Sequence, residues 1–366
     1  MQLSELIELA VKLGASDLHL TAGKPPVFRI NGTLYSLDDP KIKEMAGLDI
    51  DQSFFHPLSP ADTSRLAKEV LHHQFDLLER EGEVDFSFGI PGLARVRANV
   101  FKQRGSLALA LRILNCRIPT LEELGLPPVV AYLARRPAGL VLVTGPAGSG
   151  KSTTLAAMIN LINKEKRVHI ITLEDPIEYL HRHENSLVNQ REVGQDTRCF
   201  ARALRAALRE DPDVIMVGEM RDLETISTAI TAAETGHLVL ATLHTVSAVD
   251  TIDRIIDVFP GDQQQQVRVQ LSQVLEGIIC QLLLPRADKK GRVLAVEIMV
   301  ATPAIRNLIR EGRTHQVLSH IQTGGRWGMQ TMDASLASLY RSGLITREEL
   351  FNRARDPETL QRLLGV

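Results

Sequence analysis

A glycine-rich segment near the middle of the chain has the residues and spacing of a phosphate-binding loop. Residues 145–152 read Gly-Pro-Ala-Gly-Ser-Gly-Lys-Ser, between an apolar run at 139–144 and a helix-like stretch at 153–163. Such a turn, between a buried strand and a helix, directs backbone N–H groups at phosphate oxygens. Lys151 is then expected to reach the β- and γ-phosphates, and the Ser152 hydroxyl to bind magnesium. The predicted ligands are a nucleoside triphosphate and Mg²⁺, and the predicted binding residues are Gly145, Pro146, Ala147, Gly148, Ser149, Gly150, Lys151, Ser152 and Thr153.

Two acidic residues and a histidine each come directly after another apolar run. Glu174, Glu219 and His244 hold these places. In an open parallel sheet, ligands bind outside the carboxyl ends of the strands. If the four runs are parallel strands of one sheet, these side chains meet the phosphate-binding loop at a single edge.

The two glutamates have distinguishable roles in such a site. Glu219 ends an apolar strand in the manner of a Walker B acid, which predicts that it and Ser152 hold Mg²⁺, the glutamate through water. Glu174 is then predicted to orient or deprotonate the attacking water. The opposite assignment also fits the sequence, and a further alternative is that Asp175-Pro176 only turns the chain and leaves the acids solvated.

Two histidines bracket the last of the four apolar runs. His237 and His244 are seven residues apart, so at about 3.3 Å per residue they lie at opposite edges of a sheet. His244 is therefore predicted to sense the γ-phosphate. His237 is predicted to be structural or part of a relay.

The elements that position these residues predict an α/β fold with a mostly parallel sheet covered on both faces. After Gly261 the chain is predicted to be chiefly helical. Strands are expected at 140–144, 168–173, 213–218 and 237–243, and helices at 151–163, 198–210 and 221–235.

Residues 1–116 predict a separate, smaller α+β domain. A proline-rich stretch at 117–138 is expected to be an interdomain linker, and residues 139–366 the nucleotide-binding domain. Residues 38–57 have weak periodicity and are predicted as a loop. In the first domain we expect helices at 3–13 and 60–81 and strands at 16–21, 27–30, 84–88, 94–101 and 107–114.

Two arginines of this first domain form a second candidate constellation. If 95–101 and 107–113 form a hairpin that turns at Arg104-Gly105, Arg97 falls directly opposite Arg112. Like charges that face each other across strands are destabilising unless an anion lies between them. The pair is a candidate clamp for a nucleotide phosphate, supplied by a different domain. The alternative is that both arginines extend into solvent or pair with acids such as Asp85.

Composition excludes several other classes of protein. With 42 basic and 44 acidic residues the formal charge is −2, so no global attraction for nucleic acid is expected. No apolar run approaches the ~20 residues that span a bilayer, and the acidic start does not read as a signal peptide. A cytoplasmic location without membrane insertion is expected. The three isolated cysteines predict neither a disulfide framework nor a zinc site.

Taken together, the motifs resemble those of the bacterial type II/IV secretion ATPase superfamily, and within it the motors that retract type IV pili. The resemblance covers nearly the whole chain. It rests on residues 15–20 (Ala-Ser-Asp-Leu-His-Leu), 145–152, 173–179, 188–193, 211–222 and 237–245.

The resemblance implies a PAS-like N-terminal domain and a RecA-like ATPase domain with a helical C-terminal region. It implies a ring hexamer with ATP between domains, contacted by Arg97 and Arg112. The motor would lie in the cytoplasm at the inner face of the cytoplasmic membrane, turn a membrane-embedded platform protein, and retract the pilus for twitching motility. Residues 304–311 (Ala-Ile-Arg-Asn-Leu-Ile-Arg-Glu) resemble the signature helix of retraction motors, with Ile305, Leu308 and Ile309 on its apolar face.

Two rival functions share the catalytic residues or the fold. Pilus-assembly and type II secretion motors carry the same catalytic set, but they usually add a four-cysteine zinc insertion, for which three cysteines are too few. A DNA translocase or recombinase on a RecA-like fold is the less favoured reading because of the near-neutral charge.

Overall fold

The computed structural model describes residues 2–30, 32–42, 55–71, 74–90, 93–114 and 117–364. The predicted loop at 38–57 therefore lies largely outside the described residues. The chain divides into two compact units. One contains Met1–Arg117 and Glu178–Leu180, and the other contains Ile118–Ile177 and His181–Val366.

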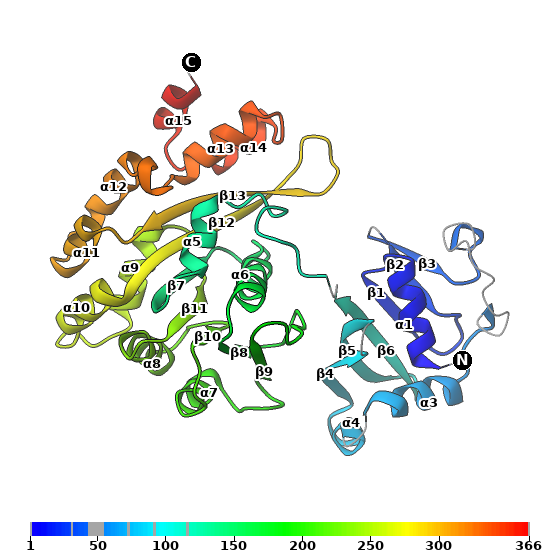
Figure 1. Cartoon of the computed structure of the whole chain (residues 1–366). Coiled ribbons are helices and arrows are strands. Elements are labelled where there is room, and N and C mark those ends of the chain that lie inside the picture. Colours follow the sequence, from blue (N-terminus) through cyan, green and yellow to red (C-terminus); the bar gives the residue numbers. More distant parts are fainter. Residues whose placement is uncertain are drawn as a thin grey trace. The chain divides into compact units, whose positions relative to one another are not determined.

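The first unit is a six-stranded antiparallel sheet with the order β3-β2-β1-β6-β5-β4, and its helices pack against one face (Figure 1). The strands are β1 (Asp17–Leu20), β2 (Val27–Ile30), β3 (Thr33–Ser36), β4 (Glu83–Ile90), β5 (Ala94–Gln103) and β6 (Ser106–Leu114). The helices are α1 (Leu3–Lys12), α3 (Pro60–Leu71) and α4 (Phe75–Glu81). The single helix predicted for 60–81 is thus replaced by α3 and α4, and β3 was not predicted.

The predicted hairpin of this unit is confirmed. Gln103 pairs with Ser106 around the turn, and Arg97 lies directly opposite Arg112. Alternate residues of β5 are buried against the helices, while Arg97 is on the opposite, exposed face. Strand alternation thus keeps both arginines off the core face.

The second unit contains a seven-stranded sheet with the order β13-β12-β7-β11-β10-β8-β9. All neighbouring pairs are parallel except the β12–β13 hairpin. The strands are β7 (Gly139–Thr144), β8 (His169–Glu174), β9 (Leu187–Glu192), β10 (Val214–Val217), β11 (Leu238–Leu243), β12 (Leu275–Pro285) and β13 (Arg292–Val300).

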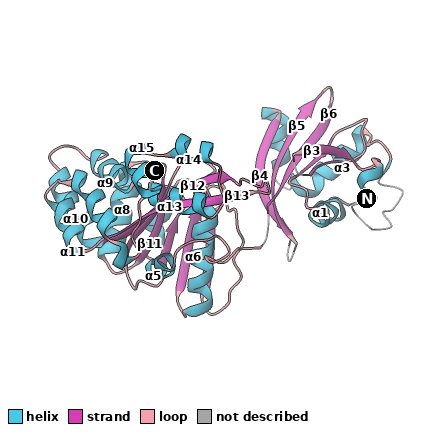
Figure 2. Ribbon diagram, turned by 90° about the horizontal axis from the view of Figure 1, so that it is seen from above, coloured by secondary structure: helices cyan, strands magenta, loops and turns pink. Residues whose placement is uncertain are grey.

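Helices cover both faces of this sheet (Figures 1 and 2). One face packs on α5 and α6, and the other on α7 to α12. The helices are α5 (Pro128–Ala134), α6 (Lys151–Glu165), α7 (Phe200–Ala207), α8 (Leu223–Glu234), α9 (Ala248–Asp257), α10 (Gln264–Val274), α11 (Pro303–Arg310), α12 (Val317–Thr323), α13 (Met332–Arg341), α14 (Arg347–Arg353) and α15 (Pro357–Leu364), with short 3₁₀ turns at Thr314–Gln316 and Gly325–Trp327.

Two features of this part of the chain differ from the prediction. The stretch after Gly261 is mostly helical as predicted, but it also contains β12 and β13, which form a long hairpin beside β7 and were not predicted. An apolar run such as that of β12 cannot be told from a buried helix by periodicity alone. Of the predicted linker at 117–138, residues 118–138 belong to the second unit and include α5, whose Val130 and Leu133 are fully buried.

The C-terminal helices α13 to α15 pack on the projecting part of the β12–β13 hairpin (Figure 1). A buried polar network anchors the loop that joins α14 and α15. Arg355 donates to Glu297 Oε2 over 3.0 Å, and the backbone N–H groups of Arg355 and Asp356 donate to Asp333. Because Glu297 is 2% exposed, removing Arg355 would leave a buried charge without its counter-charge.

Candidate active site

The glycine-rich segment forms the turn between β7 and α6, in the predicted order of strand, turn and helix. Gly145 has a φ of 144°, and a Cβ there would lie 2.4 Å from the carbonyl oxygen of Gln281. Gly150, with a φ of 90°, is the N-cap of α6. Larger residues are excluded at Gly145 by contact and strained at both positions by conformation.

Lys151 is the first residue of α6, and its ammonium group is held against the start of the turn. Its Nζ donates to the carbonyl oxygens of Gly145 and Pro146, over 2.8 and 2.9 Å. Ser152 is exposed beside it. A cation and a hydroxyl group therefore stand at the N-terminal end of a helix, where anions are favoured.

The sheet brings the predicted site residues to one edge. β7, β11, β10 and β8 are consecutive parallel neighbours, and Thr144 lies level with Leu243, as Val217 does with Leu173. The residues that follow these strands leave the same edge of the sheet. At about 4.8 Å per strand, β8 lies roughly 14 Å from β7, so His244 and Glu219 stand between the phosphate-binding loop and Glu174.

Glu219 and His244 are in direct contact. The Nε2 atom of His244 lies 3.0 Å from Glu219 Oε1, and the guanidinium of Arg221 pairs with the same oxygen. The Glu219 side chain is 19% exposed. A cavity of about 490 Å³ opens here, lined by Glu219, Met220, Arg221, Ile226, Leu243, His244, Thr245 and Arg254. Asp222 is structural, since its carboxylate accepts from the Thr225 N–H and caps α8.

Glu174 is a buried carboxylate, with 8% of the residue exposed. Its Oε1 accepts hydrogen bonds from Thr172 Oγ1, over 2.6 Å, and from Gln190 Nε2, over 3.0 Å. The alternative of a solvated turn is therefore wrong for this residue. Thr172 and Gln190 were not predicted. The signal for Thr172 is its place two residues before Glu174, on the same face of the strand.

A further unpredicted residue lies beneath the phosphate-binding loop. Gln281 of β12 is 1% exposed, and its Nε2 donates to Thr154 Oγ1 in the first turn of α6, over 2.7 Å. This bond ties the helix that carries Lys151 to a neighbouring strand. No local pattern predicts this contact, because the sequence does not identify β12 as a strand.

His237 lies at the far edge of the sheet from His244. Its Nδ1 is 2.9 Å from the carbonyl oxygen of Ala232, near the C-terminal end of α8. A carbonyl oxygen only accepts, so this ring nitrogen carries the proton. Of the two roles predicted for His237, structural or part of a relay, this contact fits the structural one.

The Arg97–Arg112 pair has an acidic neighbour in the same sheet. Arg112 Nε lies 3.1 Å from Asp17 Oδ1, and Arg29 contacts the other oxygen. Burial acts to raise the pKa of Asp17, but the Ser16 hydroxyl and the Arg112 guanidinium outweigh it and hold that pKa below its ordinary value. The acid that pairs with Arg112 is therefore Asp17, from the 15–20 motif, and not Asp85. The guanidinium stays 65% exposed.

The chemistry of the donors near the phosphate-binding loop fits magnesium. Mg²⁺ prefers oxygen ligands and keeps several waters, and Ser152 and Glu219 supply a hydroxyl and a carboxylate at one edge of the sheet. Within the described residues, no cluster of three or more His, Cys, Asp or Glu could hold a metal ion by itself.

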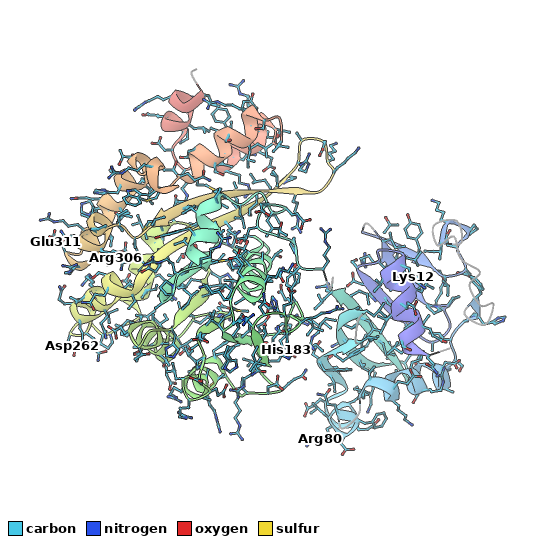
Figure 3. All side chains as sticks on the ribbon, in the orientation of Figure 1. Lys12, Arg80, His183, Asp262, Arg306 and Glu311 are labelled. Atoms are coloured by element: carbon cyan, nitrogen blue, oxygen red, sulfur yellow. The ribbon has the colours of Figure 1, made fainter. Side chains whose placement is uncertain are left out.

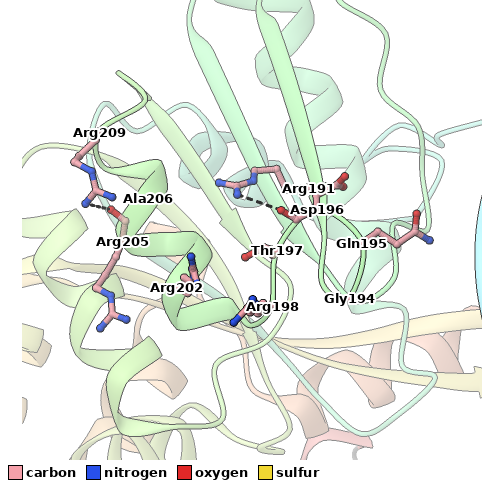
Figure 4. A pocket seen from close by; sticks show the side chains of 10 residues that line it. All are labelled: Arg191, Gly194, Gln195, Asp196, Thr197, Arg198, Arg202, Arg205, Ala206 and Arg209. Atoms are coloured by element: carbon pink, nitrogen blue, oxygen red, sulfur yellow. Dashed lines mark hydrogen bonds between the residues drawn. The ribbon is translucent and has the colours of Figure 1, made fainter.

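A second cavity, of about 790 Å³, is lined largely by arginines (Figure 4). The five arginines are Arg191, Arg198, Arg202, Arg205 and Arg209. The last four recur at helical spacing along α7 and its flanks; Arg191 pairs with Glu210, and Arg205 pairs with Glu224. Guanidinium groups gathered in this way attract carboxylates and phosphates.

Among the helices that the structure describes, none is both long and apolar enough to pass through a bilayer.

Comparison with known proteins identifies the family. The family described as "Type II/IV secretion system protein" matches residues 94–332. The type IV pilus retraction ATPase PilT of Pseudomonas aeruginosa is 49% identical over 98% of this chain and 99% of that protein, and a twitching motility protein of Neisseria gonorrhoeae is 51% identical over 83% and 81%. The crystal structure of the pilus retraction motor PilT with bound ADP superposes with a TM-score of 0.87, at 55% identity and 99% coverage of both chains. The chain belongs to the type II/IV secretion system protein family.

Proposed function

We propose that this chain is an ATP-hydrolysing motor that drives retraction of type IV pili. The observation that carries the proposal is the correspondence with a retraction ATPase along nearly the whole of both chains. The gathering of the phosphate-binding loop, two carboxylates and a histidine at one sheet edge supports it independently. The motor works as a hexamer whose subunits combine a PAS-like domain with a RecA-like ATPase domain.

In this proposal the turn at 145–153 binds the phosphates of ATP. Lys151 neutralises charge on the β- and γ-phosphates. Ser152 and, through water, Glu219 would hold Mg²⁺, which would supply further charge neutralisation. His244, held against Glu219, senses the γ-phosphate.

Glu174 is the proposed general base. It orients the attacking water and accepts its proton as the new P–O bond forms at the γ-phosphorus and the bond to the bridging oxygen breaks, leaving ADP. Its burial and its two donors support this choice, since they fix one carboxylate orientation. Glu219 is already engaged by His244 and Arg221, which suits a residue that holds a cation's water shell.

Arg97 and Arg112 are proposed to contact the nucleotide from the first unit. The partner of the assembled ring is a platform protein of the inner membrane, so the motor lies in the cytoplasm at the membrane's inner face. Nucleotide binding and release would shift each subunit between closed and open states through differential affinity.

Substitution in the purified chain tests the active site. We expect Lys151→Ala, Glu174→Gln and Glu219→Ala each to lower steady-state ATP turnover by roughly 10²–10³-fold, because each removes a preorganised charge. Lys164→Ala, on the exposed side of the same helix α6, should turn over ATP at the normal rate. Phosphate release measures the rate. Normal turnover in the Lys151 or Glu174 variant would refute the assignment.

The direction of the motor is tested in cells. A deletion strain that loses surface motility and becomes hyperpiliated supports retraction. A strain without pili would instead indicate an assembly motor.

A further inference from the structure

Gln190 makes two side-chain hydrogen bonds that link the candidate base to a distant part of the backbone. Its Nε2 donates to Glu174 Oε1 over 3.0 Å, and its Oε1 accepts from the backbone N–H of His181 over 2.8 Å. Gln190 lies on β9, level with Thr172 of β8. The same carboxylate oxygen of Glu174 is therefore held by its own strand and by the neighbouring one.

The chemistry of these partners fixes the orientation of the Gln190 amide. A backbone N–H can only donate, and an ionised carboxylate can only accept. If the amide were reversed, its oxygen would face the carboxylate and its NH₂ group would face the N–H of His181. Either contact would be repulsive. The Gln190 amide can therefore join Glu174 to the His181 backbone in one orientation only.

β9 also holds the chain on the other side of residues 178–180. The N–H of Ile177 donates to Glu192 Oε2 over 3.0 Å, and Glu192 is 4% exposed. Gln190 and Glu192 lie on the same face of β9, because side chains alternate along a strand. Ile177 and His181 both belong to the second unit, whereas the three residues between them, Glu178–Leu180, group with the first unit.

The link lies on the catalytically relevant face of the sheet. Ile170 and Val188, which share the faces of Glu174 and Gln190, pack in the cluster that contains α6, the helix that begins at Lys151. The Glu174 side chain therefore lies on the same face of the sheet as α6, the helix that begins at Lys151.

We propose that Gln190 is a positioning residue for hydrolysis, which aligns the Glu174 carboxylate and makes that alignment depend on the position of the His181 backbone. The inference rests on the role proposed above for Glu174. Displacement of the 178–181 segment would remove the His181 N–H from Gln190 Oε1 and release the amide. Glu174 Oε1 would then lose the hydrogen bond that Gln190 donates from the neighbouring strand.

Kinetics of the full-length chain test the alignment. Gln190→Leu keeps most of the side-chain volume but removes both hydrogen bonds. Loss of a hydrogen bond to a charged group predicts a fall in kcat of about 10–100-fold, with the KM for ATP and the affinity for ADP within about twofold of normal. Gln190→Glu should lose at least as much, because it sets a second carboxylate against Glu174.

Asn189→Leu is the matched control, since it removes an amide from the adjacent, exposed position of the same strand. We expect it to leave kcat unchanged. A merely structural role for Gln190 would lower nucleotide affinity or the amount of folded protein together with kcat, so unchanged ADP binding separates the two.

Hydrogen exchange without nucleotide tests the link to the backbone. The peptide that contains the His181 amide should exchange faster in Gln190→Leu than in the wild type, and Asn189→Leu should not change it. Unaltered exchange in Gln190→Leu would overturn the link.

The role of Glu174 as the base and the positioning role of Gln190 can be refuted separately. If Glu174→Gln keeps normal turnover, the assignment of the base fails whatever Gln190 does. If Glu174→Gln is inactive while Gln190→Leu has normal kcat, the positioning role fails alone. In the double variant, Gln190→Leu should cause no further loss on Glu174→Gln, because both act through one carboxylate.

Discussion

At the scale of single residues, identical side-chain types receive different roles from their surroundings. Glu174 and Glu219 both follow parallel strands, yet one is buried between two neutral donors and the other contacts a histidine and an arginine. Proton transfer needs a fixed, accepting carboxylate, whereas a cation's water shell tolerates a partly exposed one. Local donors, and not position along the chain, separate the two.

His181 shows the same dependence on surroundings, and it gives a pH-dependent stability. Burial lowers the pKa of His181 to about 4, below the value of about 6.5 expected in the unfolded chain. The unfolded state therefore binds the extra proton between these values, and the free energy of unfolding should fall as pH drops from about 6.5 to 4. The full loss is about 3 kcal/mol, of which about 2 kcal/mol falls between pH 7.5 and pH 5.

Thermal unfolding at pH 7.5 and pH 5 measures this effect. His181→Gln should show a smaller drop in midpoint between the two pH values than the wild type. The exposed His315 serves as control, and His315→Gln should keep the wild-type drop. Equal drops in all three proteins would contradict the interpretation.

At the scale of elements, α11 shows how a polar position can serve packing. Ile305, Leu308 and Ile309 are buried as predicted. Arg306, labelled in Figure 3, lies outside this apolar set. It donates to the carbonyl oxygens of Ser272 and Gln273 at the end of α10, and to Glu276. A guanidinium that satisfies the last carbonyls of a helix also complements its dipole.

This contact predicts a stability difference within the 304–311 signature. Arg306→Ala should lower the free energy of unfolding by about 2–3 kcal/mol, because it leaves helix-end carbonyls and Glu276 without a donor. Arg310→Ala, on the exposed side of the same helix, should change it by less than about 0.5 kcal/mol. Denaturant unfolding compares the two. Equal stabilities would show that α10 does not need the cap.

At the scale of the whole molecule, residues proposed to act on the nucleotide occur in each of the two units of the chain. The phosphate-binding loop, Glu174 and Glu219 belong to the second unit, whereas Arg97 and Arg112 belong to the first. Asp17 holds Arg112 in place from the neighbouring strand. A ring in which subunits complete one another's sites would make turnover depend on assembly.

Turnover and oligomer mass, measured together, test this dependence. Turnover per chain should rise with protein concentration as rings form. Arg112→Ala should reduce it by about 10²–10³-fold, as expected when one preorganised charge is removed from a site, without changing the oligomer mass. Arg29→Ala, which removes the other partner of Asp17, is the control and should remain active. Full turnover by a monomer would contradict a composite site.

Local sequence determined those features whose physical cause is local. The phosphate-binding turn depends on glycines and a helix start within eight residues, and the Arg97–Arg112 register depends on one tight turn. Apart from β9, the order of strands and helices from Gly139 to His244 follows from apolar periodicity. Each could be predicted because the residues that decide it are neighbours in the chain.

Tertiary structure alone decided the features whose cause is distant. The apolar run at 275–285 became a strand because β7 was available beside it, and the polar residues 187–192 became one through pairing with β8. Asp17 reached Arg112, and Gln190 joined Glu174 to His181, across separations that carry no periodic signal. Pairing partners far apart in the chain have no local signature, so only the folded chain could assign these contacts.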